Sequence, residues 1–419
     1  MLDDLASAEL GFAADTRYSR FQRRPTPIGW WDYQGGRWMI SGYAELLAAA
    51  GDEATFSSRH DLGDDVFTGV MVPPTPFRML PNEADPPTAR AFRRPMAAWF
   101  GPERLESYRG RVAEFADWCL DRRIEDGAID LFHDLAKLVP AMTVLDILGL
   151  PIEGAAAVAD AAGDRDTEGA ADLRQCLSAR LTQVLPQRRA APGDDLLSHL
   201  LRTQIDGRPP TEQEIVDIGL GLVVNGITTT ARLTLGGLSY FAVAPEHRES
   251  TRSDPAFLAR AIEEFLRYYS PLPFVARTAV HDVTTGGQEI LQGDPVVLGL
   301  AAANRDPDVF DRPDHIVLGR DPNPHVAFGH GPHACLGAAL GRLQAEVMIG
   351  QVLHRLPDFA AVAEESDGLL YLTPPPNRRT RSPRAAADLS WPRRTAIGLP
   401  VRFPPGKPSG RHYDFEPGG

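Results

Sequence analysis

The stretch from Thr211 to Ala244 contains no proline, and apolar residues fall on every side of a helix drawn through it. Thr211 and Glu214 have the spacing of a capping box, which marks a helix start, and Pro245 marks the end. At 1.5 Å per residue this pattern predicts a helix of about 50 Å, long enough to cross a whole domain. A helix that is apolar all round is buried. The rest of the chain must therefore pack around it.

The segments before and after this central helix also show helical periodicity, and apolar and polar residues alternate over short runs alone. Amphipathic helical spacing recurs at 43–50, 103–126, 131–148 and 261–269. Short alternating runs separated by turn residues predict hairpins at 30–41, 286–300 and 368–403. We therefore predict a mainly α fold in a single domain, residues 1–403, with a minor β region. Residues 404–419 form a polar Pro/Gly-rich tail that we expect to be disordered.

Composition limits the partners that we expect. Hydrophobic residues make up 43% and charged residues 24%, the balance of a globular protein. The net charge of −13 argues against nucleic acid or an anionic membrane as a general partner. Three cysteines form no disulfide framework, and we find neither a signal peptide nor a run of ~18 apolar residues. We expect a cytoplasmic monomer that acts on a small molecule.

The segment from Phe328 to Gly337, Phe-Gly-His-Gly-Pro-His-Ala-Cys-Leu-Gly, is a glycine-rich loop that leads into a helical pattern. Cys335 is therefore expected at a helix N-terminus, where unpaired amides and the helix dipole favour a thiolate. Such a thiolate suits the axial ligand of a haem iron. Three alternatives remain from the residues alone: a buried apolar cysteine, a catalytic nucleophile, or a zinc site shared by His330, His333 and Cys335.

This decapeptide resembles the haem-binding signature of the cytochrome P450 family, Phe-Gly-x-Gly-x-His-x-Cys-x-Gly, with every fixed position filled. The resemblance extends over roughly residues 20 to 403. It implies a cytochrome P450 fold, with the long central helix passing over a haem b, and Cys335 as the ligand of the iron. Among the other signature residues, it implies haem contacts for Phe328, Gly329, His333 and Gly337.

Two arginines match family residues that pair with haem propionates, as expected from the geometry of a guanidinium. Arg93 lies in Asp85-Pro-Pro-Thr-Ala-Arg-Ala-Phe-Arg93, and Arg277 follows the helix at 261–269. Ala89 stands where the family usually carries a histidine, so one propionate contact must come from elsewhere.

Glu264 and Arg267 lie three residues apart on one predicted helix face and match the family's Glu-x-x-Arg pair. The resemblance implies that they are buried and support the fold on the haem side. Their third partner is expected to be His315.

The central helix carries the segment Asn225-Gly226-Ile227-Thr228-Thr229-Thr230, where the family usually has Ala-Gly-x-(Asp/Glu)-Thr-Thr. Gly226 is therefore expected beside the haem, and Thr229 is expected to handle oxygen. Asn225 replaces the alanine and Thr228 replaces the acid. A threonine hydroxyl can pass on a proton but does not supply one at neutral pH. We expect water held by Asn225, Thr228 and Thr229 to replace the missing acid.

The resemblance also places the substrate. The loop at 57–85 is expected to close over it, and the residues expected to line its cavity are Val224, Leu272, Phe274, Val275 and Ile397. Nothing in these residues identifies the molecule, and a hydrophobic compound of secondary metabolism is our expectation.

The function implied is that of a monooxygenase that activates O2 to hydroxylate or epoxidise its substrate. Electrons are expected from NAD(P)H through a separate ferredoxin and ferredoxin reductase. Two alternatives remain: an atypical oxidase that couples, nitrates or desaturates, suggested by Thr228, and a non-enzymatic haem sensor. A basic patch for the ferredoxin is expected from Arg90, Arg94, Arg104, Arg109, Arg111 and Arg342.

Overall fold

The computed structural model describes residues 26–32, 35–63, 66–72, 74–126, 128–163, 167–361 and 400–402. The predicted tail at 404–419, Ile397 and most of the predicted hairpin at 368–403 lie outside the described residues.

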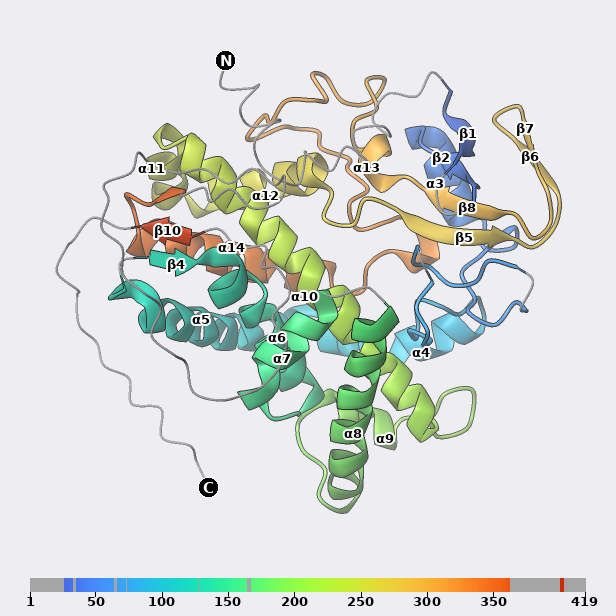
Figure 1. Cartoon of the computed structure of the whole chain (residues 1–419), viewed down its shortest axis with the longest axis horizontal. Coiled ribbons are helices and arrows are strands. Elements are labelled where there is room, and N and C mark those ends of the chain that lie inside the picture. Colours follow the sequence, from blue (N-terminus) through green and yellow to red (C-terminus); the bar gives the residue numbers. More distant parts are fainter. Residues whose placement is uncertain are drawn as a thin grey trace.

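Helices dominate the described part of the chain (Figure 1). The α-helices are α3 (Tyr43–Gly51), α4 (Thr88–Ala97), α5 (Pro102–Ile124), α6 (Leu138–Leu148), α7 (Ala155–Gly163), α8 (Thr167–Ala190), α9 (Leu196–Arg202), α10 (Glu212–Val243), α11 (Glu246–Ser253), α12 (Pro255–Tyr269), α13 (Leu300–Ala303) and α14 (Ala338–Arg355). Short 3-10 turns η1 (Ala98–Phe100), η3 (Ile152–Gly154) and η4 (Gly331–His333) and the π-helix η2 (Leu131–Ala136) connect them.

The β structure is small and lies mainly to one side of the helices (Figure 1). The largest sheet has the order β1-β2-β8-β5-β3, formed by β1 (Ile28–Trp31), β2 (Arg37–Ile40), β8 (Pro295–Leu298), β5 (Val275–Ala279) and β3 (Phe56–Ser57). A second sheet has the order β4-β10-β9, formed by β4 (Ala128–Asp130), β10 (Pro400–Arg402) and β9 (Ala360–Ala361). The third is the hairpin of β6 (Val283–Thr285) and β7 (Gln288–Ile290).

The central helix α10 forms as the sequence predicts. Thr211 accepts a hydrogen bond from the Glu214 amide and Glu214 returns one to Thr211, so the capping box is complete. Helices α6, α7, α12 and α14 pack against α10, which crosses the helical part obliquely (Figure 1). Packing against neighbouring elements buries most of its apolar residues, which offsets the helical stability that its glycines cost.

Helix α10 is also the one described helix whose length and composition would allow it to cross a membrane, contrary to the expectation that no stretch would qualify. Of the apolar window concerned, 72% is buried inside the protein. Burial of this kind is what a core helix shows.

Two predicted elements differ in the structure. The helix expected at 131–148 is divided at Lys137 into the π-helix η2 and the α-helix α6. The Asp130 carboxylate caps the start of η2 by accepting hydrogen bonds from the amides of Phe132 and His133. The hairpin expected at 286–300 is instead formed by β6 and β7, and β8 joins the large sheet. Gly286 and Gly287 adopt positive φ and make the turn themselves.

The loop at 57–85 has almost no regular structure, as its sequence predicts, yet it is packed. Met79 and Leu80 are fully buried, and the Glu83 carboxylate accepts hydrogen bonds from the amides of Val70 (3.1 Å) and Met79 (2.7 Å). Its far end is attached to α10 by Arg78, whose guanidinium lies 2.8 Å from the Asp217 carboxylate. The loop is therefore held against the N-terminal half of the central helix.

Candidate functional site

The loop that carries Cys335 is held by its own backbone. The Cys335 amide donates to the Phe328 carbonyl (2.8 Å), and the Gly329 amide donates to Val326 (2.8 Å). Gly331 has φ +69°, and a Cβ there would lie 2.7 Å from the Ala50 carbonyl oxygen of α3. Only glycine accepts both the left-handed backbone and this close approach. Gly337, the N-cap of α14, has no protein atom nearer than 4.0 Å to where its Cβ would be.

Cys335 precedes α14 by three residues, one turn earlier than the sequence suggests. Its side chain is exposed, although the surrounding protein displaces enough water for burial to raise the pKa of the thiol. The Gly337 N–H, Arg93 and Arg342 lower that pKa without reversing the shift. The amide at the helix end thus favours the thiolate as expected, but the effect of burial on the pKa is larger. The Cys335 thiol is accessible, surrounded by protein and close to an amide and two guanidinium groups. This environment suits a sulfur that binds a metal.

Arg93 from α4, Arg277 from β5 and His333 from η4 converge beside this loop. The Arg93 guanidinium donates to the Ala334 carbonyl (2.6 Å), which ties α4 to the cysteine loop. Arg277 is 5% exposed, and within the described residues its one hydrogen bond goes to the Ala276 carbonyl (2.7 Å). Burial lowers the pKa of Arg277 to about 10, while Asp85 and Glu53 raise it in part. Burial also lowers the pKa of Arg93.

His333 completes this group. Burial, with the charges of Arg277 and Arg93, lowers the pKa of His333 to about 3, so its ring is neutral at neutral pH. The ring lies 3.3 Å from the Ser58 hydroxyl and 3.4 Å from the Glu53 carboxylate. A buried guanidinium group (Arg277) and a half-buried one (Arg93) without a carboxylate at ion-pair distance are costly, and added carboxylates would offset that cost. This arrangement fits the two propionates of a haem beside the Cys335 sulfur.

The zinc alternative has no support in the structure. Among the described residues no group of three or more histidine, cysteine, aspartate or glutamate side chains could hold a metal ion. Cys119, by contrast with Cys335, is buried in α5, and desolvation raises its pKa to about 12. It is an apolar core residue.

The distal segment of α10 is an unbroken helix, and it does not bring the three expected polar residues together. The Thr229 hydroxyl donates to the Asn225 carbonyl (2.5 Å), and the Asn225 amide donates to the Gly221 carbonyl (2.7 Å), so these two side chains share one face. Thr228 is buried and donates to the Ala162 carbonyl of α7 (3.2 Å). It therefore faces another element, and the expected water site of three residues is reduced to Asn225 and Thr229.

Local packing also explains why residue 226 is a glycine. A Cβ at this position would lie 3.0 Å from the Val144 side chain of α6. The absence of a side chain thus lets α6 and α10 approach closely. The direction of the missing Cβ gives no support to the expected contact with a haem.

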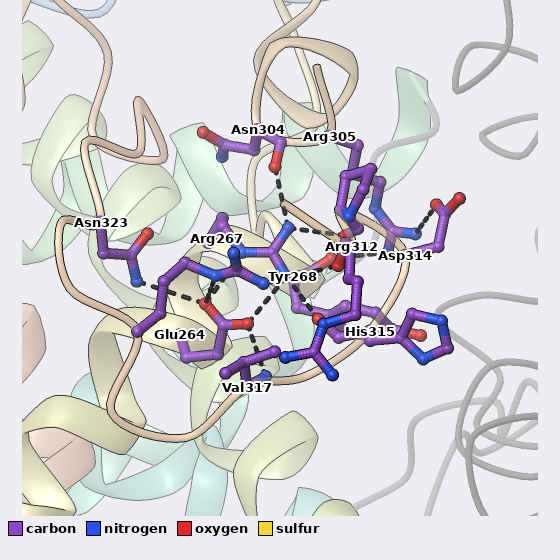
Figure 2. A network of polar contacts seen from close by, with 12 residues as sticks. Glu264, Arg267, Tyr268, Asn304, Arg305, Arg312, Asp314, His315, Val317 and Asn323 are labelled. Atoms are coloured by element: carbon purple, nitrogen blue, oxygen red, sulfur yellow. Dashed lines mark hydrogen bonds and ion pairs between the residues drawn. The ribbon is translucent and has the colours of Figure 1, made fainter. Parts of the chain in front are cut away.

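Glu264 and Arg267 form the buried pair that the sequence predicts, and both side chains are 0% exposed. Arg267 donates to both carboxylate oxygens (2.8 Å each) and to the carbonyls of Asn304, Pro313 and His315. Figure 2 shows these groups converging on the guanidinium, with the His315 ring directed away from the carboxylate.

The third member of this network is therefore Arg320 and not the side chain of His315. Arg320 Nε lies 3.0 Å from the Glu264 carboxylate, which also accepts from the Val317 amide (2.8 Å) and Asn323 (3.3 Å). His315 contributes its backbone carbonyl, which accepts a hydrogen bond from Arg267. Sequence reasoning missed Arg320, which lies 56 residues from Glu264, where no local spacing connects the two.

The residues expected to line the substrate cavity fall into different packing clusters. Val224 is buried in the main helical core, whereas Leu272 and Val275 pack against the core of the large sheet. Phe274 lies against Trp31, with ring centroids 5.8 Å apart. Ile397 lies outside the described residues. A common cavity for the four described residues stays a prediction.

The arginines expected to form a basic patch are mostly paired within the chain. Five of the six lie within 3.2 Å of a carboxylate: Arg90 of Glu53, Arg104 of Asp194, Arg109 of Glu346, Arg111 of Glu114 and Arg342 of Glu263. Arg94 has no ion pair among the described residues. The positive charge that this group offers to a partner is accordingly smaller than the sequence suggests.

Comparison with known proteins gives one consistent family. Residues 165–357 match the family model described as cytochrome P450. The chain is 33% identical to the vitamin D(3) 25-hydroxylase of Pseudonocardia autotrophica over 80% of this chain and 84% of that protein. It is also 33% identical to the cytochrome P450 monooxygenase PikC of Streptomyces venezuelae, over 78% of this chain and 77% of that protein. The structure of the Bacillus subtilis 168 bacillaene polyketide synthase cytochrome P450 PksS superposes with a TM-score of 0.76 at 25% identity, over 93% of this chain and 97% of that one.

Proposed function

The chain belongs to the cytochrome P450 family of haem monooxygenases, and from that premise we propose that it hydroxylates or epoxidises a small hydrophobic molecule with Cys335 as the axial ligand of the haem iron. The observation that carries this proposal is the exposed Cys335 sulfur beside a buried guanidinium group (Arg277) and a half-buried one (Arg93), both without a carboxylate partner in the described structure.

Each residue of this group has a role that follows from its chemistry. Arg93 and Arg277 bind the two propionates as charge-assisted hydrogen-bond donors. His333 is held neutral, so it adds an N–H donor without adding a third positive charge. The Gly337 N–H and the charges of Arg93 and Arg342 favour the Cys335 thiolate, and they set how strongly it donates to the iron. Bound haem supplies the activation of O2.

On the distal side, Thr229 is the residue that holds a proton. Its hydroxyl hydrogen is engaged with the Asn225 carbonyl, so its oxygen accepts a hydrogen bond from water or substrate. The acids of α10 are Glu212, Glu214 and Asp217, all in its first turns, and Asp217 is paired with Arg78. Protons therefore come to Thr229 through ordered water or from a group on the substrate.

The alternative reaction, an atypical oxidation such as coupling, nitration or desaturation, is favoured by one specific observation. Thr228 replaces the usual acid, and its hydroxyl is bonded to Ala162 away from Thr229. A distal face without its own acid supports reactions that consume fewer protons. Analysis of the product for an inserted oxygen atom distinguishes the two reactions.

We further propose that electrons reach the haem from NAD(P)H through a ferredoxin and its reductase, and that the protein is a cytoplasmic monomer. A relative named for polyketide biosynthesis, the PksS protein of Bacillus subtilis, is 32% identical over 64% of this chain, which supports a substrate from secondary metabolism. Because most of the candidate docking arginines are paired internally, we expect only a moderate fall of the ferredoxin-driven rate as salt rises.

The ligand assignment is tested by the reduced carbon monoxide complex. The wild-type protein should show the red-shifted Soret band of a thiolate-ligated haem, and Cys335→Ser should lose it. Cys119→Ser is the matched control, because that thiol is buried in α5 and should leave the band unchanged. A thiolate band that survives in Cys335→Ser would refute the proposal.

A further inference from the structure

Asn225 presents a fixed hydrogen-bond acceptor on the face of α10 that carries Thr229. Its side-chain nitrogen donates to the Gly221 carbonyl at 2.7 Å, one turn earlier in the same helix. A carbonyl can only accept, so the nitrogen must point to Gly221 and the amide orientation is set. The Asn225 oxygen consequently points away from the helix backbone. No donor among the described residues lies within hydrogen-bond distance of it.

The surroundings keep the amide in this orientation. The sulfur of Met79 lies 4.0 Å from the Asn225 nitrogen and covers that side of the group. Met79 is fully buried, and its amide is bonded to the buried Glu83 carboxylate. A Cβ on Gly221 would lie 2.9 Å from the Leu80 carbonyl, so the loop lies directly against α10 here. The position of Asn225 is thus determined by two elements that are far apart in sequence.

Thr229 adds a second acceptor on the same face. Its hydroxyl hydrogen is engaged with the Asn225 carbonyl at 2.5 Å, which leaves the oxygen lone pairs available. Residues four apart on a helix lie about 5–6 Å from each other between Cβ atoms. The face therefore offers two acceptors. Of its side-chain donors, the Thr229 hydroxyl and one Asn225 N–H are used by the helix backbone, and the Asn225 nitrogen also faces the Met79 sulfur.

We propose that Asn225 is a specificity-determining residue that selects substrates with a neutral hydrogen-bond donor, a hydroxyl or an amide N–H, close to the carbon that is oxidised. This inference rests on the proposed function, because it takes the face of Thr229 to be the one above the haem. It adds the class of substrate, which the proposed function leaves open.

The neutral donor follows from the charges nearby. An ammonium group taken out of water needs a carboxylate partner, since burying an unpaired charge is costly. The nearest acid on α10, Asp217, lies two turns before Asn225 and is engaged by Arg78 (2.8 Å) and Gln213 (2.8 Å). A hydroxyl or an amide N–H needs only the acceptor that Asn225 provides.

The test uses iron-binding probes that carry the donor with them. 4-Phenylimidazole, the ortho, meta and para isomers of 4-(hydroxyphenyl)imidazole and the corresponding 4-(methoxyphenyl)imidazoles are titrated optically into the haem-loaded protein. We expect at least one hydroxyl isomer to bind about three- to tenfold tighter than its methoxy counterpart, the range of one hydrogen bond. Asn225→Leu, close in size but without the acceptor, should remove this preference and leave the affinity for 4-phenylimidazole within about twofold.

Thr228→Val is the control, because its hydroxyl is bonded to Ala162 and the preference should survive. The reduced carbon monoxide spectrum shows whether each variant is folded and loaded, and Asn225→Ala replaces Asn225→Leu if that variant is not. An unchanged preference in the loaded Asn225 variant, or no preference in the wild type, would overturn the inference. Absence of a thiolate-ligated haem in the wild type would instead overturn the proposed function.

Discussion

Removing the charge of Glu264 should strongly destabilise the folded protein, although the substitution Glu264→Gln changes only one non-hydrogen atom. Glu264 and Arg267 are both 0% exposed, and the carboxylate accepts two hydrogen bonds of 2.8 Å from the guanidinium. Glutamine leaves the Arg267 charge buried without a counter-charge. It also places an NH2 group against the donors of Arg320 or Val317, which need an acceptor.

The magnitude follows from the burial of both partners. Breaking a buried ion pair by removing one partner costs about 3–5 kcal/mol. A domain has a total stability of roughly 5–15 kcal/mol, so this loss is a large fraction of it. Arg312→Ala is the surface control, since its pair with Asp311 is 63% and 88% exposed, and such pairs contribute about 0–1 kcal/mol.

Urea unfolding of the haem-loaded proteins, followed by circular dichroism, measures this difference. A second comparison separates charge burial from simple loss of contacts. Glu264→Leu combined with Arg267→Met removes both charges of the pair. It should be less destabilising than the sum of the two single changes, because Arg267 is no longer a buried charge without a partner, while Arg320 loses its carboxylate equally in Glu264→Leu and in the double variant. A loss under about 1 kcal/mol in Glu264→Gln would show that water or backbone carbonyls compensate Arg267, and the reasoning would fail.

Three further predictions address the distal face, the capping box and the cysteine loop. With a substrate that is turned over, Thr229→Ala should raise the peroxide released per NAD(P)H consumed. Thr228→Val should leave that ratio unchanged, because the Thr228 hydroxyl is bonded to Ala162. Equal effects of the two changes would contradict the role given to Thr229. The Arg208 hydrogen bond lowers the pKa of Glu214 from 4.5 to about 2, so its contribution is present above pH 4.5 and lost as pH falls toward 2. The stability gap between wild type and Glu214→Gln, measured by urea unfolding, should therefore narrow over that range, and a gap independent of pH would count against the ion pair. Gly331→Ala should lower Tm more than Gly207→Ala. Both glycines have positive φ, but only a Cβ at position 331 would lie 2.7 Å from the Ala50 carbonyl oxygen. Equal shifts in Tm would show that α3 moves to accommodate the methyl group.

Features that depend on neighbours along the chain could be predicted from the sequence. The capping box of Thr211 and Glu214, the pairing of Glu264 with Arg267 and the hairpin of β1 and β2 all formed as expected. Each rests on a spacing of a few residues that helix or hairpin geometry imposes on any chain. The glycine-rich loop around Cys335 belongs to the same class, since its turns need glycine wherever the chain folds.

Partners that lie far along the chain were decided only by the tertiary structure. Arg320, not the side chain of His315, reaches Glu264, and Thr228 turns to the Ala162 carbonyl 66 residues away. The arginines expected to form a docking patch meet carboxylates as distant as Glu346, which lies 237 residues from Arg109. The physical reason is that helix geometry determines which face a side chain occupies, whereas the packing of the whole core determines what that face meets.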